Sequence, residues 1–345
     1  GSAGTGAGDG AGAGADAATL GRAQLQETSM QAVMYDQFGD ASVLSVRETA
    51  VPQAGRGEVQ VRVRLASLNP VDFKLRSGIL RMVGRPKRPA ITGKDFAGEI
   101  SALGADVQGY KVGQRVFGSV DPMDGQGSCA QFVALSTDLI APTPDALSDE
   151  VAASLPVASG TALQALTDIA GLQRGQSILI TGASGAVGAS AVQLARSIGA
   201  RITGVCSTAN IDYVRSIGAE YVIDYTAGHW QQLDERFDVI FDAAAATSFS
   251  KAQPRLTTKG IYINTMPRAA LYWAAIVART TSRQRCVPFL LKTDAALLQR
   301  LAKFAAEDII VPHIHEIIDF DQVAPAQRRM QEGKVHGKVC VRVAD

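Results

Sequence analysis

Hydrophobic and polar residues alternate strictly over 59–65 (VQVRVRL), a pattern that predicts a half-buried β-strand. From residue 30 to about 150, glycine and proline interrupt the chain at short intervals, and another strand-like run, 338–343, lies near the C-terminus. Short strands joined by tight turns are typical of a partly closed β-barrel. We therefore expect a β-rich unit that begins near Met30 and includes the C-terminal stretch.

The pattern changes near residue 150, where predicted helices and strands begin to alternate. Residues 149–172 are predicted to be helical, with Ser148 as the N-cap and Gly171 at the end. The apolar run 177–181 predicts a buried parallel strand. Predicted helices at 186–198, 210–217, 228–235 and 246–256 then alternate with predicted strands at 201–206, 220–224, 237–242 and 259–264. This succession is typical of a doubly wound parallel sheet.

The pattern predicts an α/β protein with two domains. The β-rich domain takes residues 30–152 and 292–345, and the doubly wound domain takes residues 153–291. Residues 1–29 are rich in glycine and alanine and have too little apolar periodicity to form a core, so we expect a disordered leader. This leader is consistent with a linker from a larger polypeptide and equally with an upstream tail.

Composition narrows the class of protein. The 345 residues are 46% hydrophobic and 19% charged, with a net charge of +1, which argues against a protein specialised for nucleic acid or for membranes. The longest apolar stretch, 269–278, is too short for a membrane span, and no secretory signal pattern is present. The four cysteines are scattered without a C-x-x-C pair, which favours a reducing, cytoplasmic environment.

A glycine-rich turn between the strand at 177–181 and the helix at 186–198 is the strongest local motif. Gly182 allows a tight turn, Gly185 lets the backbone approach a pyrophosphate, and Gly188 permits close packing of helix on strand. The N–H groups and the positive dipole end of the helix then face the phosphates. We predict a dinucleotide site formed by Gly182, Ala183, Ser184, Gly185, Ala186, Val187 and Gly188. The alternative is a glycine turn that packs an unliganded sheet.

The loop after the second strand of this domain indicates which dinucleotide binds. An NAD site places a carboxylate about twenty residues after the turn, but the first carboxylate beyond Cys206 is Asp212, inside the next predicted helix. Hydroxyl and amide groups accept a 2′-phosphate, whereas a carboxylate repels it. The sequence therefore favours NADPH, bound through Ser207, Thr208 and Asn210. Capping of the following helix by Ser207 or Asn210 is an alternative role that does not exclude binding.

Five short motifs, in a fixed order, carry a resemblance to a known family. They are Asn69-Pro70-Val71-Asp72, Gly93-Lys94-Asp95-Phe96-Ala97-Gly98, Gly160-Thr161-Ala162, the turn Ala183–Gly188, and Gly337-Lys338. Over roughly residues 30–345 the chain resembles the zinc-free quinone reductase and enoyl reductase branch of the medium-chain dehydrogenase/reductase superfamily. The resemblance implies a GroES-like catalytic domain, a Rossmann domain and an active site in the cleft between them. It also makes a homodimer, formed edge to edge by two Rossmann sheets, a candidate assembly.

The resemblance also implies that the chain has lost a catalytic metal. Zinc-dependent relatives carry a cysteine, a His-Glu pair and a further ligand where this chain has Asn69, Lys94-Asp95 and Val157. Because a catalytic zinc needs three correctly placed donors, we expect no metal. His313 and His315, two residues apart near a predicted strand, are expected to be surface residues and not ligands.

Without a Lewis acid, the site suits acceptors that delocalise negative charge as a hydride arrives. We expect an NADPH-dependent enzyme that reduces an activated carbon–carbon double bond or a quinone in a small hydrophobic substrate. The candidate catalytic residues are Asn69, Lys74 and Asp72. Asn69 either binds a substrate or cofactor oxygen or caps the turn before Pro70. Lys74 either donates to the enolate or is a solvated charge, and Asp72 is expected to pair with Lys94.

The resemblance assigns four further residues to the cofactor site. Thr161 lies beside the nicotinamide in relatives, Tyr225 near the adenosine, and Asn264 in the nicotinamide pocket, while Lys338 belongs to the last motif. Thr161 is alternatively an ordinary helix threonine. Some enoyl reductases carry a tyrosine proton donor where this chain has Leu80, so protonation here is expected from water or another side chain.

Two other functions stay open. The Gly/Ala-rich leader suggests an enoyl reductase that works on carrier-bound acyl chains as part of a larger assembly, and an intact nucleotide site is compatible with a catalytically idle partner protein. Residues 268–291, with Tyr272, Trp273 and Phe289, are predicted to be helical and apolar. This segment is expected to wall a substrate pocket, to pack a dimer interface or to form a plain core helix.

Overall fold

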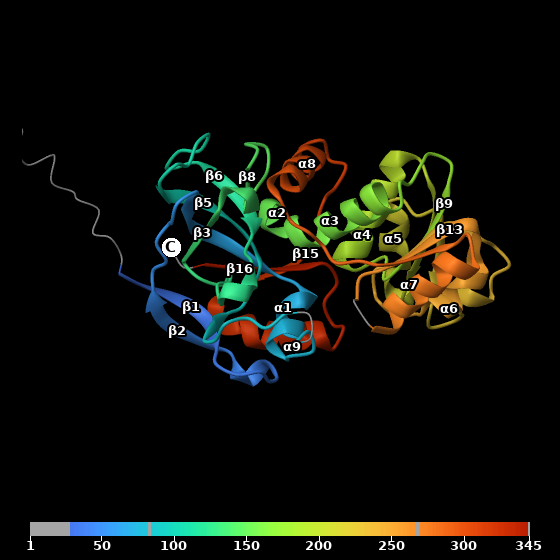
Figure 1. Cartoon of the computed structure of the whole chain (residues 1–345), viewed down its shortest axis with the longest axis horizontal. Helices are drawn as coiled ribbons and strands as arrows, with labels where there is room; N and C mark the ends of the chain where they lie inside the picture. Colours follow the sequence, from blue (N-terminus) through green and yellow to red (C-terminus); the bar gives the residue numbers. More distant parts are fainter. Residues whose placement is uncertain (1–27, 82–83, 267–268, 344–345) are drawn as a thin grey trace, which may run out of the picture.

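The computed structural model describes residues 28–81, 84–266 and 269–343, which form two domains lying side by side (Figure 1). The β-rich domain combines the first third of the chain with its last elements, and the middle of the chain forms the parallel-sheet domain. The predicted combination of a β-rich domain with a doubly wound sheet is confirmed. In this part of the chain, no helix has the length and apolar character needed to cross a bilayer.

Two sheets form the β-rich domain. A seven-stranded sheet has the order β15-β16-β3-β5-β6-β8, with β7 added on β3, and a three-stranded sheet has the order β2-β1-β4. The alternation seen in the sequence is confirmed in β3, where Val59, Val61 and Val63 are buried while Arg62 and Arg64 are exposed. The strands are β1 (Ser29–Tyr35), β2 (Ser45–Ala50), β3 (Glu58–Leu68), β4 (Ala90–Ile91), β5 (Asp95–Leu103), β6 (Arg115–Ser119), β7 (Phe132–Ser136), β8 (Ile140–Pro142), β15 (Ile314–Ile318) and β16 (Lys338–Arg342). Two helices, α1 (Pro70–Arg76) and α9 (Val323–Gln331), pack against each other beside them.

The second domain is a six-stranded sheet in the order β11-β10-β9-β12-β13-β14, and every strand pair in it is parallel. Its strands are β9 (Ser177–Thr181), β10 (Arg201–Cys206), β11 (Tyr221–Asp224), β12 (Phe237–Asp242), β13 (Leu256–Asn264) and β14 (Arg285–Pro288). Ile178 and Ile180 of β9 face the hydrophobic cluster that includes α4 (Ala186–Ile198), whereas Leu179 faces the cluster on the side of α6 (Phe249–Ala252) and α7 (Ala269–Thr281). Both faces of the sheet are therefore covered by helices, α5 (Ile211–Ser216) lying on the α4 side.

The structure corrects three of the predicted helices. The segment 228–235 forms only a short 3-10 turn, Trp230–Gln232, and 246–256 is helical only in α6 and the 3-10 turn after it. The prediction of helix throughout 268–291 was wrong, because α7 ends at Thr281 and β14 follows it as the last strand of the sheet. Residues of β14 pair in register with Ile261–Asn264 of β13, a long-range pairing that the local apolar pattern cannot reveal.

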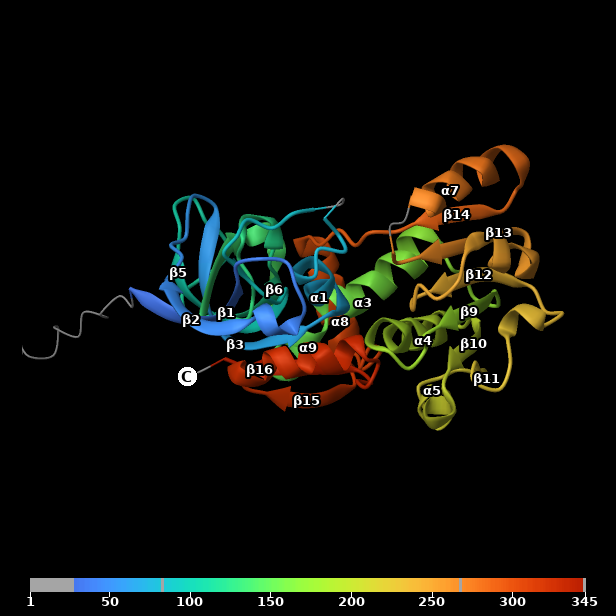
Figure 2. The ribbon, with the colours of Figure 1, turned by 90° about the horizontal axis from the view of Figure 1, so that it is seen from below.

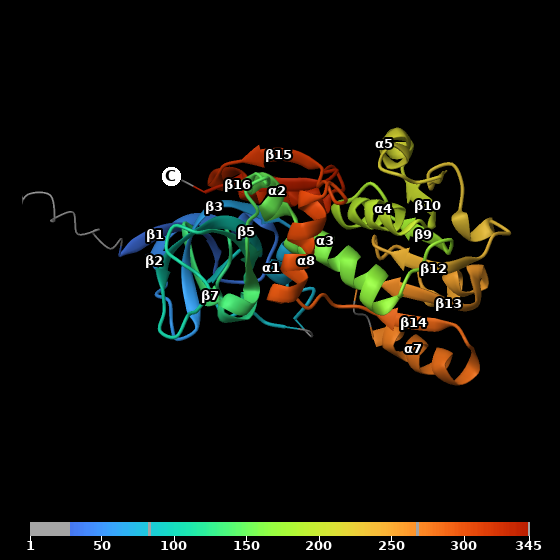
Figure 3. The same ribbon diagram turned by 90° about the horizontal axis from the view of Figure 1, so that it is seen from above.

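Three helices fill the space between the domains (Figure 3). They are α2 (Asp149–Ser154), α3 (Pro156–Leu163) and α8 (Ala295–Ala306). The predicted N-cap is confirmed, since Ser148 Oγ accepts a bond from the N–H of Val151, and Gly171 after the helical stretch has a positive φ. One hydrophobic cluster joins Leu65 and Phe117 of the β-rich domain to Ile178 and Phe241 of the parallel sheet through these helices. The two domains thus share a core.

Candidate cofactor and catalytic site

The glycine-rich turn has the geometry of a phosphate cradle. Gly182 has a φ of +62° immediately after β9, and Gly185 is the N-cap of α4. A Cβ on Gly188 would lie 2.1 Å from the carbonyl oxygen of Gly182, so only glycine allows α4 to approach the end of β9 this closely. Because a glycine N-cap has no side chain, no side-chain cap is bonded to the first N–H groups of α4. The turn therefore fits the pyrophosphate of a dinucleotide.

The predicted residues of the turn divide into two groups. Ala183 and Gly188 are buried, and the N–H of Ala183 donates to the carbonyl of Val205 in β10, at 3.0 Å. These two positions serve packing. The residues that stay partly accessible, and so can reach a ligand, are Gly182, Ser184, Gly185, Ala186 and Val187.

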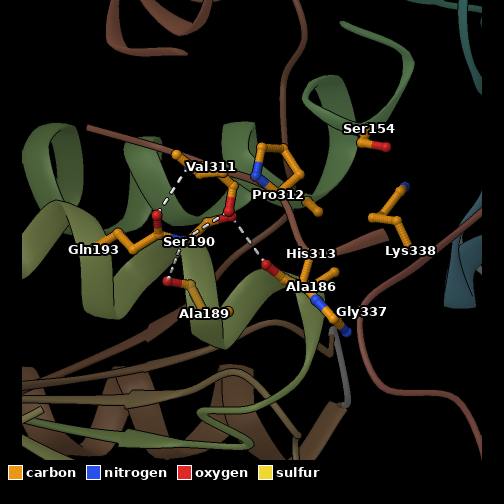
Figure 4. Close-up of a pocket in the computed structure, with 11 residues that line it drawn as sticks. Ser154, Ala186, Ala189, Ser190, Gln193, Val311, Pro312, His313, Gly337 and Lys338 are labelled. Atoms are coloured by element: carbon orange, nitrogen blue, oxygen red, sulfur yellow. Dashed lines mark hydrogen bonds between the residues drawn. The ribbon is translucent and has the colours of Figure 1, made fainter. Parts of the chain in front are cut away.

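A narrow pocket beside the start of α4 connects this turn with the β-rich domain (Figure 4). It has room for about one water molecule, so it is a crevice at the junction and not a dinucleotide site by itself. Two of its lining residues are bonded to each other, because the Gln193 amide both donates to and accepts from the backbone of Val311, at 3.2 and 2.9 Å. The lining residues are Ser154, Ala158, Ala186, Ala189, Ser190, Gln193, Val311, Pro312, His313, Gly337 and Lys338.

The loop after β10 is held by a carboxylate that the sequence analysis missed. Asp224 ends β11, and parallel pairing places it opposite Cys206. One oxygen of Asp224 accepts from the Thr208 hydroxyl at 2.5 Å, and the other accepts from the N–H and hydroxyl of Thr226, at 2.8 and 2.6 Å. These hydrogen bonds lower the pKa of Asp224, and the bond from Thr208 makes the largest contribution. The sequence analysis considered only residues that follow β10 in the chain and found no carboxylate before Asp212. Asp224 reaches the loop from the neighbouring strand β11, so its position in the sequence did not reveal it.

Ser207 and Asn210 face each other in this loop. The Asn210 amide donates to the Ser207 hydroxyl at 2.9 Å and lies 3.5 Å from Nδ1 of His336, which arrives from the segment before β16. Neither side chain makes a capping bond to the helix that follows, so the capping alternative was wrong. Tyr225, directly after β11, is exposed, and its N–H donates to the carbonyl of Cys206.

Two of the positions at which the chain differs from zinc-dependent relatives, Asn69 and Asp95, form a buried polar cluster with Lys338. Lys338, at the start of β16, donates to Oδ1 of Asn69 at 2.7 Å and lies 3.5 Å from Asp95, at the start of β5. The Asn69 amide donates to Asp95 at 2.9 Å, as does the N–H of Val157 at 3.1 Å. All three side chains are at most 2% exposed. Asn69 is thus bonded at both ends of its carboxamide and is not a free group in a cleft.

This cluster does not fit a zinc ion. A charged ammonium cannot coordinate a metal, and an asparagine and one aspartate do not complete a set of three donors. Within residues 28–81, 84–266 and 269–343, no group of three or more His, Cys, Asp or Glu side chains is arranged to hold a metal. We therefore assign no step of the chemistry to a metal.

Asp72 caps helix α1 and does not pair with Lys94 as expected. Its Oδ2 accepts from the N–H of Asn69 at 2.6 Å, while its Oδ1 has no hydrogen-bond partner among the described residues. At the third helical position, a carboxylate reaches back to the N-cap more easily than across to another strand. Burial raises the pKa of Asp72 to about 7, the Asn69 bond opposes that shift, and the nearby Asp95 adds to it.

Lys74 lies two residues after Asp72 in α1, and its side chain reaches the loop that follows β13 of the parallel sheet. Its half-buried ammonium is 3.7 Å from the sulfur of Met266, two residues after Asn264 at the end of β13. Thr161 of α3 is 7% exposed, and its hydroxyl donates to the carbonyl of Val157 at 2.6 Å, the bond of an ordinary helix threonine. Of the three candidate catalytic residues, Lys74 is the one that reaches toward the other domain.

Asp242, another residue that the sequence analysis missed, ties together three strand ends of the parallel sheet. This buried carboxylate at the end of β12 accepts from the Thr181 hydroxyl, the Tyr262 hydroxyl and the Asn264 amide, at 2.5, 2.8 and 3.0 Å. Burial, and then the charge of Asp242, raise the pKa of Tyr262 well above its usual value. An aspartate directly after the apolar run 239–241 was the signal in the sequence. The cluster fixes Asn264, whose Oδ1 accepts from the N–H of Met266 at 2.8 Å.

Two family models match the chain. "Alcohol dehydrogenase GroES-like domain" covers residues 55–145, and "Zinc-binding dehydrogenase" covers residues 217–341. The chain is 32% identical over 323 residues to the chloroplast envelope quinone oxidoreductase homolog of Arabidopsis thaliana, covering 90% of this chain and 98% of that protein. It is 29% identical to 2-methylene-furan-3-one reductase of Solanum lycopersicum, covering 91% and 79%. The quinone oxidoreductase of Coxiella burnetii superposes with a TM-score of 0.84 at 29% identity, covering 92% and 100%.

Proposed function

The chain belongs to the zinc-free, quinone-reductase-like branch of the medium-chain dehydrogenase/reductase family, and from this we propose that it is an NADPH-dependent reductase of an enone or a quinone. Membership makes it an oxidoreductase with a nicotinamide cofactor. The observation that carries the proposal is the Lys338–Asn69–Asp95 cluster, in which Asn69 and Asp95, at two positions that differ from zinc-dependent relatives, bind an ammonium. The similar proteins named for quinones and for 2-methylene-furan-3-one support acceptors that delocalise negative charge.

The proposed cofactor site runs along the carboxyl ends of the parallel strands. The pyrophosphate would lie on the accessible residues of the glycine turn, the 2′-phosphate on Ser207, Thr208 and Asn210, and the adenosine near Tyr225. Thr161 and Asn264 would border the nicotinamide, while Lys338 would act on the site through Asn69. We favour NADPH over NADH because Ser207, Thr208 and Asn210 follow β10 with no carboxylate before Asp212, while the charge of Asp224, which accepts from Thr208, opposes a 2′-phosphate there. Bound there, NADPH supplies a hydride.

Among the residues of this chain, we assign the electrophilic role to Lys74. A half-buried ammonium at the junction of the domains would stabilise the negative charge that develops on a carbonyl oxygen. Asn69 and Asp72 become positioning residues, because they fix the start of α1 and hence the direction of Lys74. Leu80 is 9% exposed and has no proton to give, so the proton comes from water or from another side chain. A reducing, cytoplasmic setting is part of the proposal, since all four cysteines are unpaired and buried.

The test is NADPH oxidation by the purified protein with a panel of enones and quinones, run in parallel with NADH. We expect turnover with at least one acceptor and a lower KM for NADPH. Lys74→Met should lower kcat while leaving the Kd of NADPH within about threefold, and Lys74→Arg should restore part of the loss. Tight NADPH binding without oxidation by any acceptor would instead support the idle partner protein.

A substitution in the glycine turn provides a second, independent test of the proposed pyrophosphate site. Gly185→Asp would place a carboxylate against the pyrophosphate and should raise the Kd of NADPH by about 100-fold or more. The matched control is Gly228→Asp, since a Cβ at Gly228 has no heavy atom within 4 Å and that backbone needs no positive φ. Equal NADPH affinity in the two variants would refute the cradle assignment.

A further inference from the structure

The loop proposed to hold the 2′-phosphate of NADPH has no cation of its own. Residues 207–214 contain no lysine or arginine, and Thr208 donates to the carboxylate of Asp224 at 2.5 Å. A 2′-phosphate brings roughly two negative charges to this loop at neutral pH. Because like charges repel, the site favours NADPH only if a positive group from another part of the chain balances the charge of Asp224.

An imidazole from the β-rich domain reaches this loop. Nδ1 of His336 lies 3.5 Å from the amide nitrogen of Asn210, which also donates to the Ser207 hydroxyl at 2.9 Å. His336 is exposed, so a ligand that lies on Ser207 and Asn210 can also contact the imidazole ring. The contact crosses between the domains, because His336 belongs to the segment before β16 and Asn210 to the loop after β10.

The backbone next to His336 is fixed in place. Gly337 has a φ of +102°, and a Cβ there would lie 2.3 Å from the carbonyl oxygen of His313, to which the N–H of Lys338 donates at 2.8 Å. Figure 4 shows Gly337 and His313 beside Ala186, at the start of α4. In Figures 2 and 3, the starts of β15 and β16 point toward α4 and α5. His336 is therefore held beside both the glycine turn and the loop after β10.

We propose that His336, in its charged form, binds the 2′-phosphate of NADPH and thereby selects NADPH over NADH. This inference rests on the proposed function, and it adds a residue of the β-rich domain to the adenosine end of the cofactor site. An imidazolium N–H that donates to a phosphate oxygen makes a charge-assisted bond and opposes the charge of Asp224. NADH has a hydroxyl at this position and gains no such bond.

The other charged groups nearby are less suited to this role. The ionisable residues on the neighbouring elements are Asp212 and Arg215 of α5, Asp224 of β11, His313 and His315 at the start of β15, and Glu332 and Lys334 before β16. Arg215 lies 4.0 Å from Asp212, and Lys334 lies 2.7 Å from Glu332, so both cations are already paired. The ring of His313 lies against Tyr213, with centroids 5.3 Å apart, and the ring of His315 is 6.5 Å from that of His336.

Titration of the purified full chain with NADPH and with NADH tests the proposal. The Kd of each is measured by calorimetry at about pH 6.5 and 8.5, a range over which imidazole loses its charge. We expect the preference for NADPH to be larger at the lower pH. His336→Gln should raise the Kd of NADPH about tenfold at the lower pH and leave the Kd of NADH within about twofold. His336→Arg should keep the preference at both pH values, because a guanidinium stays charged.

Two further variants show whether the effect belongs to His336. Lys334→Gln removes an exposed cation two residues away that is paired with Glu332, so it should leave both Kd values unchanged. His315→Gln removes the neighbouring imidazole and should change the Kd of NADPH by less than about threefold. The melting temperature without cofactor should be the same in all of these variants, because the three side chains are exposed.

Two kinds of result would overturn the proposal. If His336→Gln bound NADPH as tightly as the parent protein, lost affinity for both dinucleotides equally, or behaved like Lys334→Gln, then His336 would not recognise the 2′-phosphate. The proposed reductase would stand in that case, since NADPH would still bind and be oxidised. A parent protein that binds neither dinucleotide, or prefers NADH at both pH values, would overturn the assignment of His336 together with the proposed cofactor.

Discussion

Lys338 is a buried cation whose two acceptors, Asn69 and Asp95, lie in different strands and loops of the β-rich domain. A buried charge is tolerated only with a partner, and removing one member of such a pair leaves the other uncompensated. We predict that Lys338→Met lowers the free energy of unfolding by about 3–5 kcal/mol. Urea unfolding measures this loss.

Two controls separate the lost charge pair from the lost side chain. Adding Asp95→Asn to Lys338→Met removes the second charge and should recover a large part of the stability. Lys334→Met removes a lysine that is 68% exposed and should change stability by about 0.5 kcal/mol or less. If Lys338→Met is as mild as Lys334→Met, the cluster does not hold the domain together.

Asp72 makes stability depend on pH near neutrality. Burial raises its pKa from 3.8 to about 7 in the folded state, so the folded protein holds this proton more tightly than the unfolded chain does. The associated stability is present below about pH 4 and is lost as the pH rises through 7. Asp72→Asn keeps an acceptor for the N–H of Asn69 but cannot ionise. We predict that it flattens the profile and adds on the order of 2 kcal/mol at pH 8.

The measurement is the free energy of unfolding of both proteins from pH 5 to 8. Asp145→Asn, which alters an exposed aspartate of the same domain, should leave the profile of the parent protein unchanged. Parallel profiles for the parent protein and Asp72→Asn would show that Asp72 is already ionised at pH 5.

At the scale of elements, the contact between α4 and β9 depends on one missing side chain. A methyl group on Gly188 would meet the Gly182 carbonyl oxygen at 2.1 Å, so the helix has to move away from the strand. We predict that Gly188→Ala costs roughly 2–4 kcal/mol of stability and weakens NADPH binding, because the N–H groups at the helix start move with it. Thermal unfolding and an NADPH titration measure the two effects. Gly228→Ala, in open space, should alter neither, and a Gly188→Ala protein with unchanged affinity would contradict the assigned role.

Elements whose signal is local were predictable from the sequence. The strand predicted from the apolar run 177–181 and the helix predicted at 186–198 match β9 and α4 at the bounds the structure shows. β14 was not predictable, because Arg285–Pro288 has no alternating pattern and becomes a strand only by pairing with β13. The helix predicted at 228–235, between β11 and β12, was also wrong. Helical propensity alone does not form a helix where no apolar face packs against the rest of the protein.

The residues of the candidate site also divide into those that are contiguous in the sequence and those that only the fold brings together. The glycine turn is contiguous, so its spacing alone indicated a pyrophosphate cradle. Asp224 reaches Thr208 from a neighbouring strand, and Lys338 reaches Asn69 across 269 residues of chain. Contacts of this kind depend on register and topology, which a single sequence does not specify. Motif resemblance identified Asn69 and Lys338 as important, but it could not reveal that they bond to each other.

For the whole molecule, the shared core determines how the domains respond to a ligand. Leu65 and Phe117 belong to the same buried cluster as Ile178 and Phe241, with α2, α3 and α8 between them (Figures 1 and 3). Two domains with separate cores unfold separately, whereas a continuous core couples their unfolding. A cofactor that contacts mainly the parallel-sheet domain should therefore also stabilise the β-rich domain.

The four buried cysteines allow this coupling to be measured. Cys129 and Cys340 report on the β-rich domain, and Cys206 and Cys286 on the parallel sheet. We predict that pulsed thiol labelling in urea exposes both pairs at the same midpoint. NADPH at about 100 times its Kd should add about 2.7 kcal/mol to both, by mass action. If NADPH protected Cys206 and Cys286 while Cys129 and Cys340 were labelled at their original midpoint, the two domains would unfold independently. Ligand binding stabilises only the residues that unfold in the same cooperative unit as the binding site.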